Sequence, residues 1–142
     1  MKKFILFGMM VVLTACGEPD NSPAYVQSAK TDVRNAIVAN IIQDTHFKCF
    51  SIQDVVTTIW TMACFMDNEP NPTPILLYAV HELPSDINPP FTYQLVALNG
   101  KAIQYKDKPA FKMFKITRGE DVTMNVRVSE IIQLYQEAYF NK

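Results

Sequence analysis

The pattern of apolar and polar positions predicts a helix at the start of the folded part of the chain. Between Ala24 and Ile42, apolar residues recur every three or four positions, and polar residues fill the remaining faces. Such spacing is typical of an amphipathic helix that buries one side. We expect this helix to pack on the domain's own sheet. The apolar positions are Val26, Ala29, Val33, Ile37 and Ile41.

The next stretch, from Asp54 to Met66, fits both a helix and a strand. Its apolar residues have helical spacing, but residues 55–61 are an unbroken run of β-branched and aromatic side chains. Such runs favour a strand, because branched side chains lose freedom in a helix. We choose a strand, and two cysteines considered below bear on that choice.

Downstream, the pattern predicts short strands joined by turns and then a last helix. Asn99-Gly100 is a strong hairpin signal, and Arg118-Gly119-Glu120 is a second turn. Ser129 can cap a helix in which Ile131, Leu134, Tyr135 and Ala138 share a face. The predicted strands span 75–83, 91–98, 101–106, 110–117 and 121–128.

These elements together predict an α+β fold. An N-terminal and a C-terminal helix would pack on an antiparallel sheet of about five or six strands. The chain has 142 residues and is 49% hydrophobic, which is enough for one buried core.

The first fifteen residues have the pattern of an export signal. Lys2 and Lys3 supply a positive start, and residues 4–12 are an uncharged apolar run. A helix needs about 20 apolar residues to cross a bilayer, so this run is too short to span one. It has the size of a signal-peptide core instead. Leu13-Thr14-Ala15-Cys16 follows at once, and turn-forming polar residues begin at Gly17.

In these residues the chain resembles the precursors of bacterial lipoproteins. Leu13-Thr14-Ala15-Cys16 matches the lipobox of that class. The resemblance implies cleavage before Cys16, a diacylglyceryl group on its sulfur and a fatty acyl group, such as palmitate, on the new amino group. In enterobacterial members, Asp after the cysteine favours the inner membrane, so Gly17 is compatible with delivery to the outer membrane, facing the periplasm. Two or three acyl chains anchor a protein stably, whereas one does not.

The resemblance also divides the chain. We expect a signal peptide at 1–15, the acylated cysteine with a flexible spacer at 16–23, and one globular domain at 24–142. Apart from the acyl groups on Cys16, we predict no cofactor.

Cys49 and Cys64 are the only cysteines after Cys16. In an exported protein such a pair tends to form a disulfide. The bond requires Cα atoms within about 7 Å. One straight helix over residues 51–66 would hold the two cysteines about 20 Å apart. The disulfide and the helix exclude each other, and we predict the disulfide, which also favours the strand.

Charge is unevenly distributed along the chain. After Cys16 there are 14 acidic and 11 basic residues, and so weak an acidity gives no general attraction for nucleic acid. Residues 18–100 carry nine acidic and three basic side chains, whereas residues 101–142 carry eight basic and five acidic ones. The halves could present faces of opposite sign, although internal charge complementarity is the favoured interpretation.

Six basic residues near the end of the domain are interleaved with the aromatic residues Tyr105, Phe111 and Phe114. One hypothesis is that they bind an anionic surface: lipid headgroups, a glycan or an acidic protein patch. The favoured alternative is a solvated sheet face whose lysines protect an edge strand. The six are Lys101, Lys106, Lys108, Lys112, Lys115 and Arg118.

Candidates for a metal site and for catalysis are few. His46-x-x-Cys49 has plausible ligand spacing, with Cys64 or His81 to complete a site, but oxidation competes for the thiols. We predict no metal site and expect His81 to be a hydrogen-bonded structural residue. The chain has four glycines, and neither a nucleophile elbow nor a phosphate-binding glycine loop. A dispersed set of carboxylates, Asp54, Glu82 and Asp107, is the remaining enzymatic alternative.

The leading hypothesis is a membrane-anchored, non-catalytic lipoprotein that binds or helps to assemble an envelope complex through an envelope protein partner. The second is a surface inhibitor or exclusion factor that acts on an enzyme, a phage or a conjugating cell. The third is a small envelope hydrolase.

Overall fold

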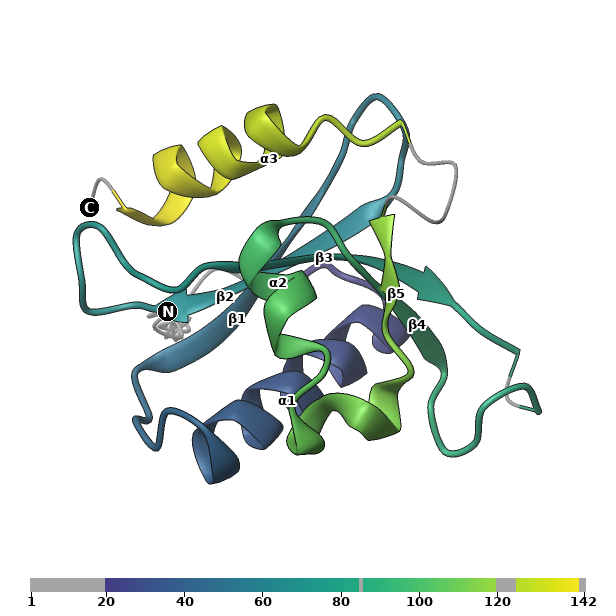
Figure 1. Cartoon of the computed structure of the whole chain (residues 1–142). Coiled ribbons are helices and arrows are strands. Elements are labelled where there is room, and N and C mark those ends of the chain that lie inside the picture. Colours follow the sequence, from purple (N-terminus) through teal and green to yellow (C-terminus); the bar gives the residue numbers. More distant parts are fainter. Residues whose placement is uncertain (1–19, 85, 120–124, 141–142) are drawn as a thin grey trace, which may run out of the picture.

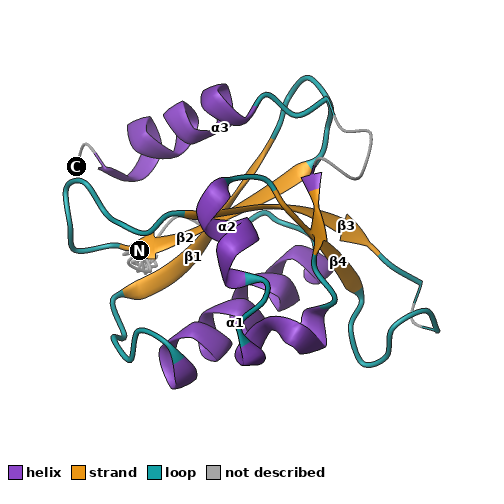
Figure 2. Ribbon diagram, in the orientation of Figure 1, coloured by secondary structure: helices purple, strands orange, loops and turns teal. Residues whose placement is uncertain are grey.

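The computed structural model describes residues 20–84, 86–119 and 125–140. One five-stranded sheet has the order β1-β2-β3-β4-β5, and helices cover both of its faces (Figure 1). The helix α1 (Ala24–Asn40) lies on one face, and α3 (Val128–Tyr135) lies on the other (Figure 2). The shorter α2 (Gly100–Tyr105) and η1 (Pro109–Phe114) pack on the same side as α1. The predicted α+β class with terminal helices on a sheet is confirmed. The strands are β1 (Phe47–Gln53), β2 (Trp60–Met66), β3 (Leu76–Glu82), β4 (Tyr93–Ala97) and β5 (Thr117–Arg118).

The predicted first helix is present as α1 (Ala24–Asn40). The backbone N–H groups of Val26 and Gln27 both donate to the carbonyl of Pro23, which starts the helix. Four of the five predicted apolar positions are buried against the sheet, as the spacing predicts, whereas Ile41 follows the helix as its C-cap residue and is partly buried. The fully or nearly fully buried positions are Val26, Ala29, Val33, Ala36 and Ile37.

The ambiguous stretch is a strand preceded by a turn. Residues 54–59 form the turn, and β2 follows it and pairs with β1 in an antiparallel hairpin. Backbone hydrogen bonds Asp54 N–Ile59 O (2.8 Å) and Asp67 N–His46 O (2.9 Å) set the phase of the ladder. Hydrogen-bonded and non-hydrogen-bonded pairs alternate along an antiparallel ladder. Counted from these two bonds, Cys49–Cys64 is a non-hydrogen-bonded pair, in which the Cα atoms lie closer together.

The predicted disulfide is present between these two cysteines. Cys49 lies directly opposite Cys64, their Cα atoms are 4.0 Å apart, and the sulfur atoms are bonded. The argument that the bond excludes a helix therefore led to the right element. The strand β1, by contrast, is one that the apolar pattern leaves unassigned.

The predicted hairpin at Asn99-Gly100 is wrong, because Asn99 begins the short helix α2 (Gly100–Tyr105) instead. Its side-chain oxygen accepts hydrogen bonds from the backbone N–H groups of Ala102 (3.1 Å) and Leu77 (3.2 Å), and its amide donates to the carbonyl of Ile75 (2.8 Å). Asparagine favours helix N-caps as well as turns, since its side chain replaces a backbone partner in both. Here the cap also attaches α2 to β3.

The predicted strands at 101–106 and 110–117 are also wrong. The first is α2, and most of the second is the 3-10 helix η1 (Pro109–Phe114), with proline at its start, where the lack of an N–H costs nothing. Of the two predicted strands, only Thr117 lies in a strand, at the start of β5, and β5 runs parallel to β4. The sheet is therefore mixed, whereas an antiparallel sheet was predicted. Half of the strand predicted at 121–128 lies outside the described residues, and residues 125–127 are not in a strand.

The C-terminal helix α3 (Val128–Tyr135) is present and continues into a π-helical turn, Gln136–Phe140. Ser129 lies inside the helix and does not cap it, because Arg127 holds the cap position without a side-chain hydrogen bond. Ile131 and Tyr135 are buried against the second face of the sheet, as predicted, but Leu134 is 40% exposed. The buried stripe of α3 is narrower than its sequence suggests.

A closed set of hydrogen bonds ties α3 to the hairpin of β1 and β2. The backbone N–H of Ile52 donates to the hydroxyl oxygen of Tyr135 (2.9 Å), and the hydroxyl of Thr61 donates to the carbonyl of Ile52 (2.7 Å). The Tyr135 and Thr61 oxygens are 3.0 Å apart. The Thr61 hydroxyl donates its single proton to the Ile52 carbonyl. The Tyr135 hydroxyl therefore donates to the Thr61 oxygen, and every hydroxyl proton has an acceptor.

This arrangement predicts opposite results for two buried tyrosines. Tyr135→Phe removes a buried hydroxyl that accepts from the Ile52 N–H and shares a hydrogen bond with Thr61, and it should lower the free energy of unfolding by about 1 kcal/mol. The hydroxyl of Tyr78 is buried and has no hydrogen-bond partner among the described residues. Tyr78→Phe should therefore leave stability unchanged or raise it by about 1 kcal/mol. Urea unfolding of both variants checks the pair, and an equal loss in both would contradict it.

Candidate functional site

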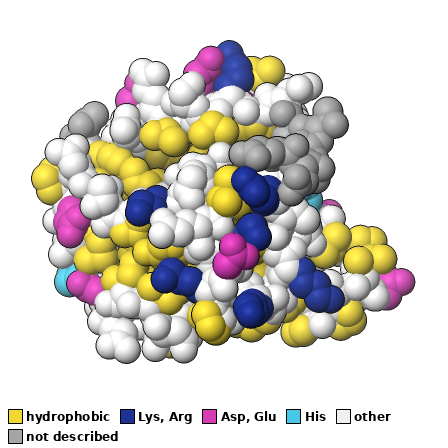
Figure 3. Space-filling model, in the orientation of Figure 1, with side chains coloured by type: hydrophobic (Ala, Val, Ile, Leu, Met, Phe, Trp, Pro, Cys, Tyr) yellow, Lys and Arg dark blue, Asp and Glu magenta, His cyan; other side chains and the backbone are white. Residues whose placement is uncertain are grey.

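The structure places the six basic residues on one connected segment of the chain. The five lysines lie on or directly beside α2 and η1, and only Arg118 lies on a strand, β5. The alternative of a solvated sheet face with edge-protecting lysines is therefore wrong for the lysines. Lys and Arg side chains gather over α2 and η1 (Figure 3). We call Lys101, Lys106, Lys108, Lys112, Lys115 and Arg118 the basic face.

The fold of η1 explains how its charges reach solvent. Phe111 and Phe114 are buried and pack with their ring centroids 5.8 Å apart, which fixes η1 against the core. Lys112 and Lys115 are exposed on the opposite side, and Met113 between them is 54% exposed. Because the two phenylalanine rings point into the core, the two lysines and Met113 are exposed together on the outside of η1.

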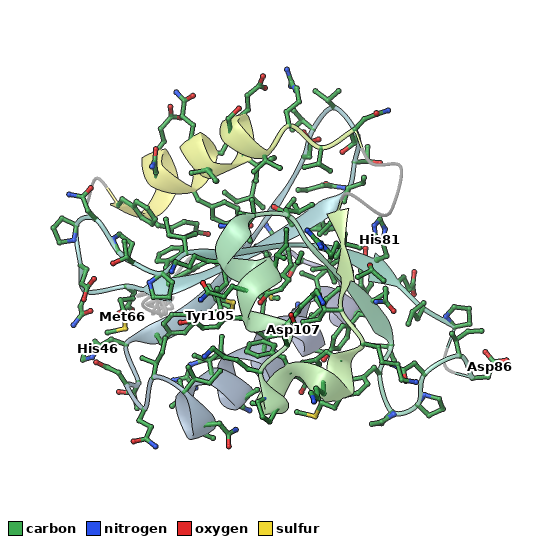
Figure 4. The ribbon with its side chains drawn as sticks, viewed as in Figure 1. His46, Met66, His81, Asp86, Tyr105 and Asp107 are labelled. Carbon is green, nitrogen blue, oxygen red and sulfur yellow. A yellow bond between two sulfur atoms is a disulfide. The ribbon has the colours of Figure 1, made fainter. Side chains whose placement is uncertain are left out.

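Few groups neutralise the basic face. Asp107, which is exposed, forms an ion pair of 2.9 Å with Lys106. The ammonium of Lys108 lies 4.9 Å above the ring of Tyr105, a cation–π contact that keeps its charge. Tyr105 and Asp107 are both labelled in Figure 4. Among the described residues, Asp107 is the one acidic residue in an ion pair with these five lysines, so the lysines of the basic face keep a net positive charge.

The chain enters the domain beside α1. Cys16, the predicted lipidation site, lies outside the described residues. Asp20 forms an ion pair with Lys30 of α1, and its carboxylate also accepts a hydrogen bond from the backbone of Ser22 (3.0 Å). Gln27 donates to the carbonyl of Ser22 (2.7 Å). The last part of the expected spacer is therefore held against α1.

The metal-site alternative loses its two sulfur ligands. Cys49 and Cys64 are bonded to each other, so neither offers a thiolate. His46 instead contacts the carboxylate of Asp44 (3.0 Å), and His46 and His81 lie apart on different sides of the view in Figure 4. No group of three potential ligand residues is close enough to hold a metal ion in the part of the chain that the structure describes.

The three candidate carboxylates do not form a site. Asp54 lies in the hairpin turn, Glu82 at the end of β3 and Asp107 between α2 and η1. Asp54 is nearly buried, and its oxygens accept hydrogen bonds from the Thr57 hydroxyl (2.6 Å) and the Val56 N–H (3.2 Å). It braces the turn. The geometry gives no support to a pair of carboxylates that act on one substrate.

This bracing makes Asp54 sensitive to acid. The hydrogen bond from Thr57 lowers the pKa of Asp54 below its usual value. A carboxylate with a lowered pKa stabilises the fold above the unfolded pKa of about 3.9, and that stability is lost as pH falls through the folded pKa. We expect Asp54→Asn to be less stable than the wild type near neutral pH, with the gap closing below about pH 4. Urea unfolding across this range checks it, and a constant gap would contradict it.

A shallow hollow of about 550 Å³ lies between the hairpin turn and α3. Asp54, Glu130 and Glu137 are among its lining residues. Each has a partner, since Glu130 pairs with Arg127 (2.7 Å) and Glu137 accepts a hydrogen bond from Gln133 (3.1 Å). The carboxylates that line the hollow are therefore already bonded within the domain.

The structure also reveals an apolar tip that the sequence pattern missed. Val55 and Val56 lie in the turn before β2 and are 86% and 66% exposed. Within a predicted strand, one of two adjacent valines would be expected to be buried. The turn could have been found from Asp54 and Thr57, whose side chains stabilise turns by bonding to nearby groups.

Comparisons with known proteins leave the chain without an assigned relative. No family model, curated protein or solved structure matches it. Among the helices that the structure describes, none has both the length and the apolar character needed to cross a membrane.

Proposed function

We propose that the chain is a lipoprotein held to a cell-envelope membrane by acyl groups on Cys16, and that its domain is a non-catalytic binding or assembly module. The observation that carries the proposal is the sequence Leu13-Thr14-Ala15-Cys16 directly after a short apolar run that begins with two lysines. Charge, apolar length, small residues and cysteine coincide there in the order that a lipoprotein signal requires.

The entry of the chain into the domain supports a close attachment. Asp20 is paired with Lys30, and it follows Cys16 by four positions, with three residues between them. An extended chain spans at most about 3.5 Å per residue, so this tether reaches about 14 Å. The domain would stay at the membrane surface, where a tether raises its effective concentration for neighbouring partners.

Fatty-acid labelling in a bacterial host tests the anchor. The wild-type chain should incorporate a labelled fatty acid and collect in the membrane fraction, and Cys16→Ser should lose both properties. The matched control is the double variant Cys49→Ser/Cys64→Ser, which removes the other two cysteines and should keep the label. Label that persists in Cys16→Ser would contradict the proposal.

Binding is supported by two exposed features rather than by a catalytic site. The lysines of the basic face carry more positive charge than Asp107 neutralises, and Val55 and Val56 expose an apolar tip. Exposed apolar residues grouped beside polar ones often mark contact sites. Crosslinking of the acylated protein in envelopes should capture a partner that the variant Val55→Ser/Val56→Ser captures less. An identical set of captured proteins would count against binding through the tip.

The braced turn also favours a second candidate, a surface inhibitor or exclusion factor. Its tip projects two valines, and Asp54 fixes the turn through Thr57 and Val56. A rigid exposed loop loses little entropy when it binds, which suits an inhibitor. Cells that produce the double valine variant should then be as sensitive to the phage, enzyme or conjugating cell as a deletion strain. Unchanged sensitivity in the deletion strain would remove this candidate.

A further inference from the structure

We propose that the basic face docks on anionic headgroups of the bilayer that carries the anchor, and that this contact orients the domain. The inference rests on the proposed lipid attachment and adds a second, electrostatic contact to it. One outward side of the domain would then lie on the lipid, while α3 and the hairpin tip would face away from it.

The anchored end and the basic face lie on the same side of the sheet. Val26 and Val33 of α1 belong to one buried cluster with Phe111 and Phe114 of η1. The residues of α3 belong to a separate cluster on the other face, around Ile131. Figure 2 shows α1 on the side of the sheet opposite α3, and Ala102 of α2 belongs to the same buried cluster as α1. The described chain enters at the start of α1, and the hollow beside Lys108 lies at the end of α1, so both lie on the side of the sheet that would meet the membrane.

The chemistry of the basic face fits a diffuse anionic surface better than one discrete anion. Five of its six cations are lysines, which act as flexible point charges, whereas bidentate recognition of a phosphate or carboxylate uses arginine. The hollow beside it is lined by Asn40, Ile41, Lys108, Pro109 and Ala110, and so contains one cation. A small anion would find few converging donors there.

Met113 adds an apolar contact between two exposed lysines. Its side chain is 54% exposed and stands on η1 between Lys112 and Lys115. Peripheral membrane contacts combine basic residues with apolar side chains that enter the boundary between headgroups and acyl chains. The basic residues and Met113 give this combination on one short helix.

The expected strength follows from the number of charges. Each Lys or Arg close to an anionic bilayer raises the bound-to-free ratio about fivefold at moderate salt. Because the acyl anchor already holds the domain within reach of the surface, a few such charges suffice to keep it docked. Removal of two lysines should lower the docked-to-undocked ratio about 25-fold.

Hydrogen exchange of the mature, acylated protein in vesicles tests the proposal. Vesicles of phosphatidylcholine alone are compared with vesicles that also contain phosphatidylglycerol. Backbone amides in 100–118 should exchange more slowly only in the anionic vesicles, and high salt should abolish the difference. Lys112→Gln/Lys115→Gln should lose the protection. The matched control Lys48→Gln/Arg127→Gln, which removes two exposed charges from β1 and from the start of α3, should keep it.

Each other outcome overturns a definite part of the account. Equal exchange in both vesicles, or protection that survives Lys112→Gln/Lys115→Gln, would overturn docking through the basic face. Protection that appears only after envelope proteins are added would assign the face to an acidic protein partner instead. A chain that fails to float even with phosphatidylcholine vesicles would overturn the anchor itself, whereas a chain that floats without anionic protection overturns docking alone.

Discussion

Replacing Cys49 and Cys64 with alanine is expected to lower the free energy of unfolding by about 3 kcal/mol. The bond joins residues 15 positions apart. In the chain-entropy model, closing a loop of that length lowers the entropy of the unfolded chain and so stabilises the fold by about 3 kcal/mol. The two strands should still pair, because the bond joins residues that already lie opposite each other in the ladder. Urea unfolding of the variant beside the oxidised wild type measures the loss.

Reduced wild-type protein is the natural control for this prediction. With the disulfide reduced, its unfolding midpoint should approach that of the double alanine variant. Cys16 is unchanged in both proteins, so the anchor does not contribute to the difference. A variant with the midpoint of the oxidised wild type would show that the bond contributes nothing to stability.

The second large effect is expected at Phe111. Its ring is completely buried and packs between Tyr105 and Phe114, at centroid distances of 6.3 and 5.8 Å. Phe111→Ala should lower the free energy of unfolding by about 3–5 kcal/mol, through lost apolar burial and the cavity that remains. Because Phe111 holds η1 on the core, the same variant should also loosen the positions of the neighbouring lysines.

Met113→Ala is the matched control for Phe111→Ala. It lies two residues away on η1 and is 54% exposed, so its truncation should change stability by less than about 0.5 kcal/mol. Thermal unfolding of the two variants, together with hydrogen exchange of the amides in 109–114, separates their effects. Equal losses of stability would mean that η1 does not depend on its buried ring.

The fold was predictable where periodicity and covalent geometry agreed. The apolar stripe of α1 is regular over its whole length and is buried as expected. In the ambiguous stretch, local pattern alone could not separate helix from strand. The disulfide resolved it, because a covalent bond between Cys49 and Cys64 limits the separation of two points in the chain.

The region after β4 could not be derived because its turn signals have two structural uses. Asn99-Gly100 suits a hairpin, but Asn99 caps a helix whose residues Ala102 and Ile103 pack on the core. The Asn99 side chain that caps this helix also bonds to the carbonyl of Ile75, directly before β3, and to the N–H of Leu77 within β3. Contacts distant in sequence therefore decided a local structure, as tertiary packing often does.

The candidate site was predictable in its residues but not in its form. The six basic residues are evident as a cluster in the sequence, yet their placement on α2 and η1 follows from the buried rings of Phe111 and Phe114. The exposed valines at the hairpin tip were predicted to lie in a strand because local propensity was the only signal, and the same signal gave the wrong elements after β4. Local propensity describes a segment, whereas exposure depends on what the rest of the chain leaves uncovered.

The most direct test of the account is the mass of the N-terminal peptide of the mature protein, purified from native membranes. The account predicts a peptide that begins at Cys16 and carries the additional mass of a diacylglyceryl group, with or without an acyl group on its amine. A peptide that retains Met1, or one that begins at Cys16 with an unmodified thiol, would contradict it.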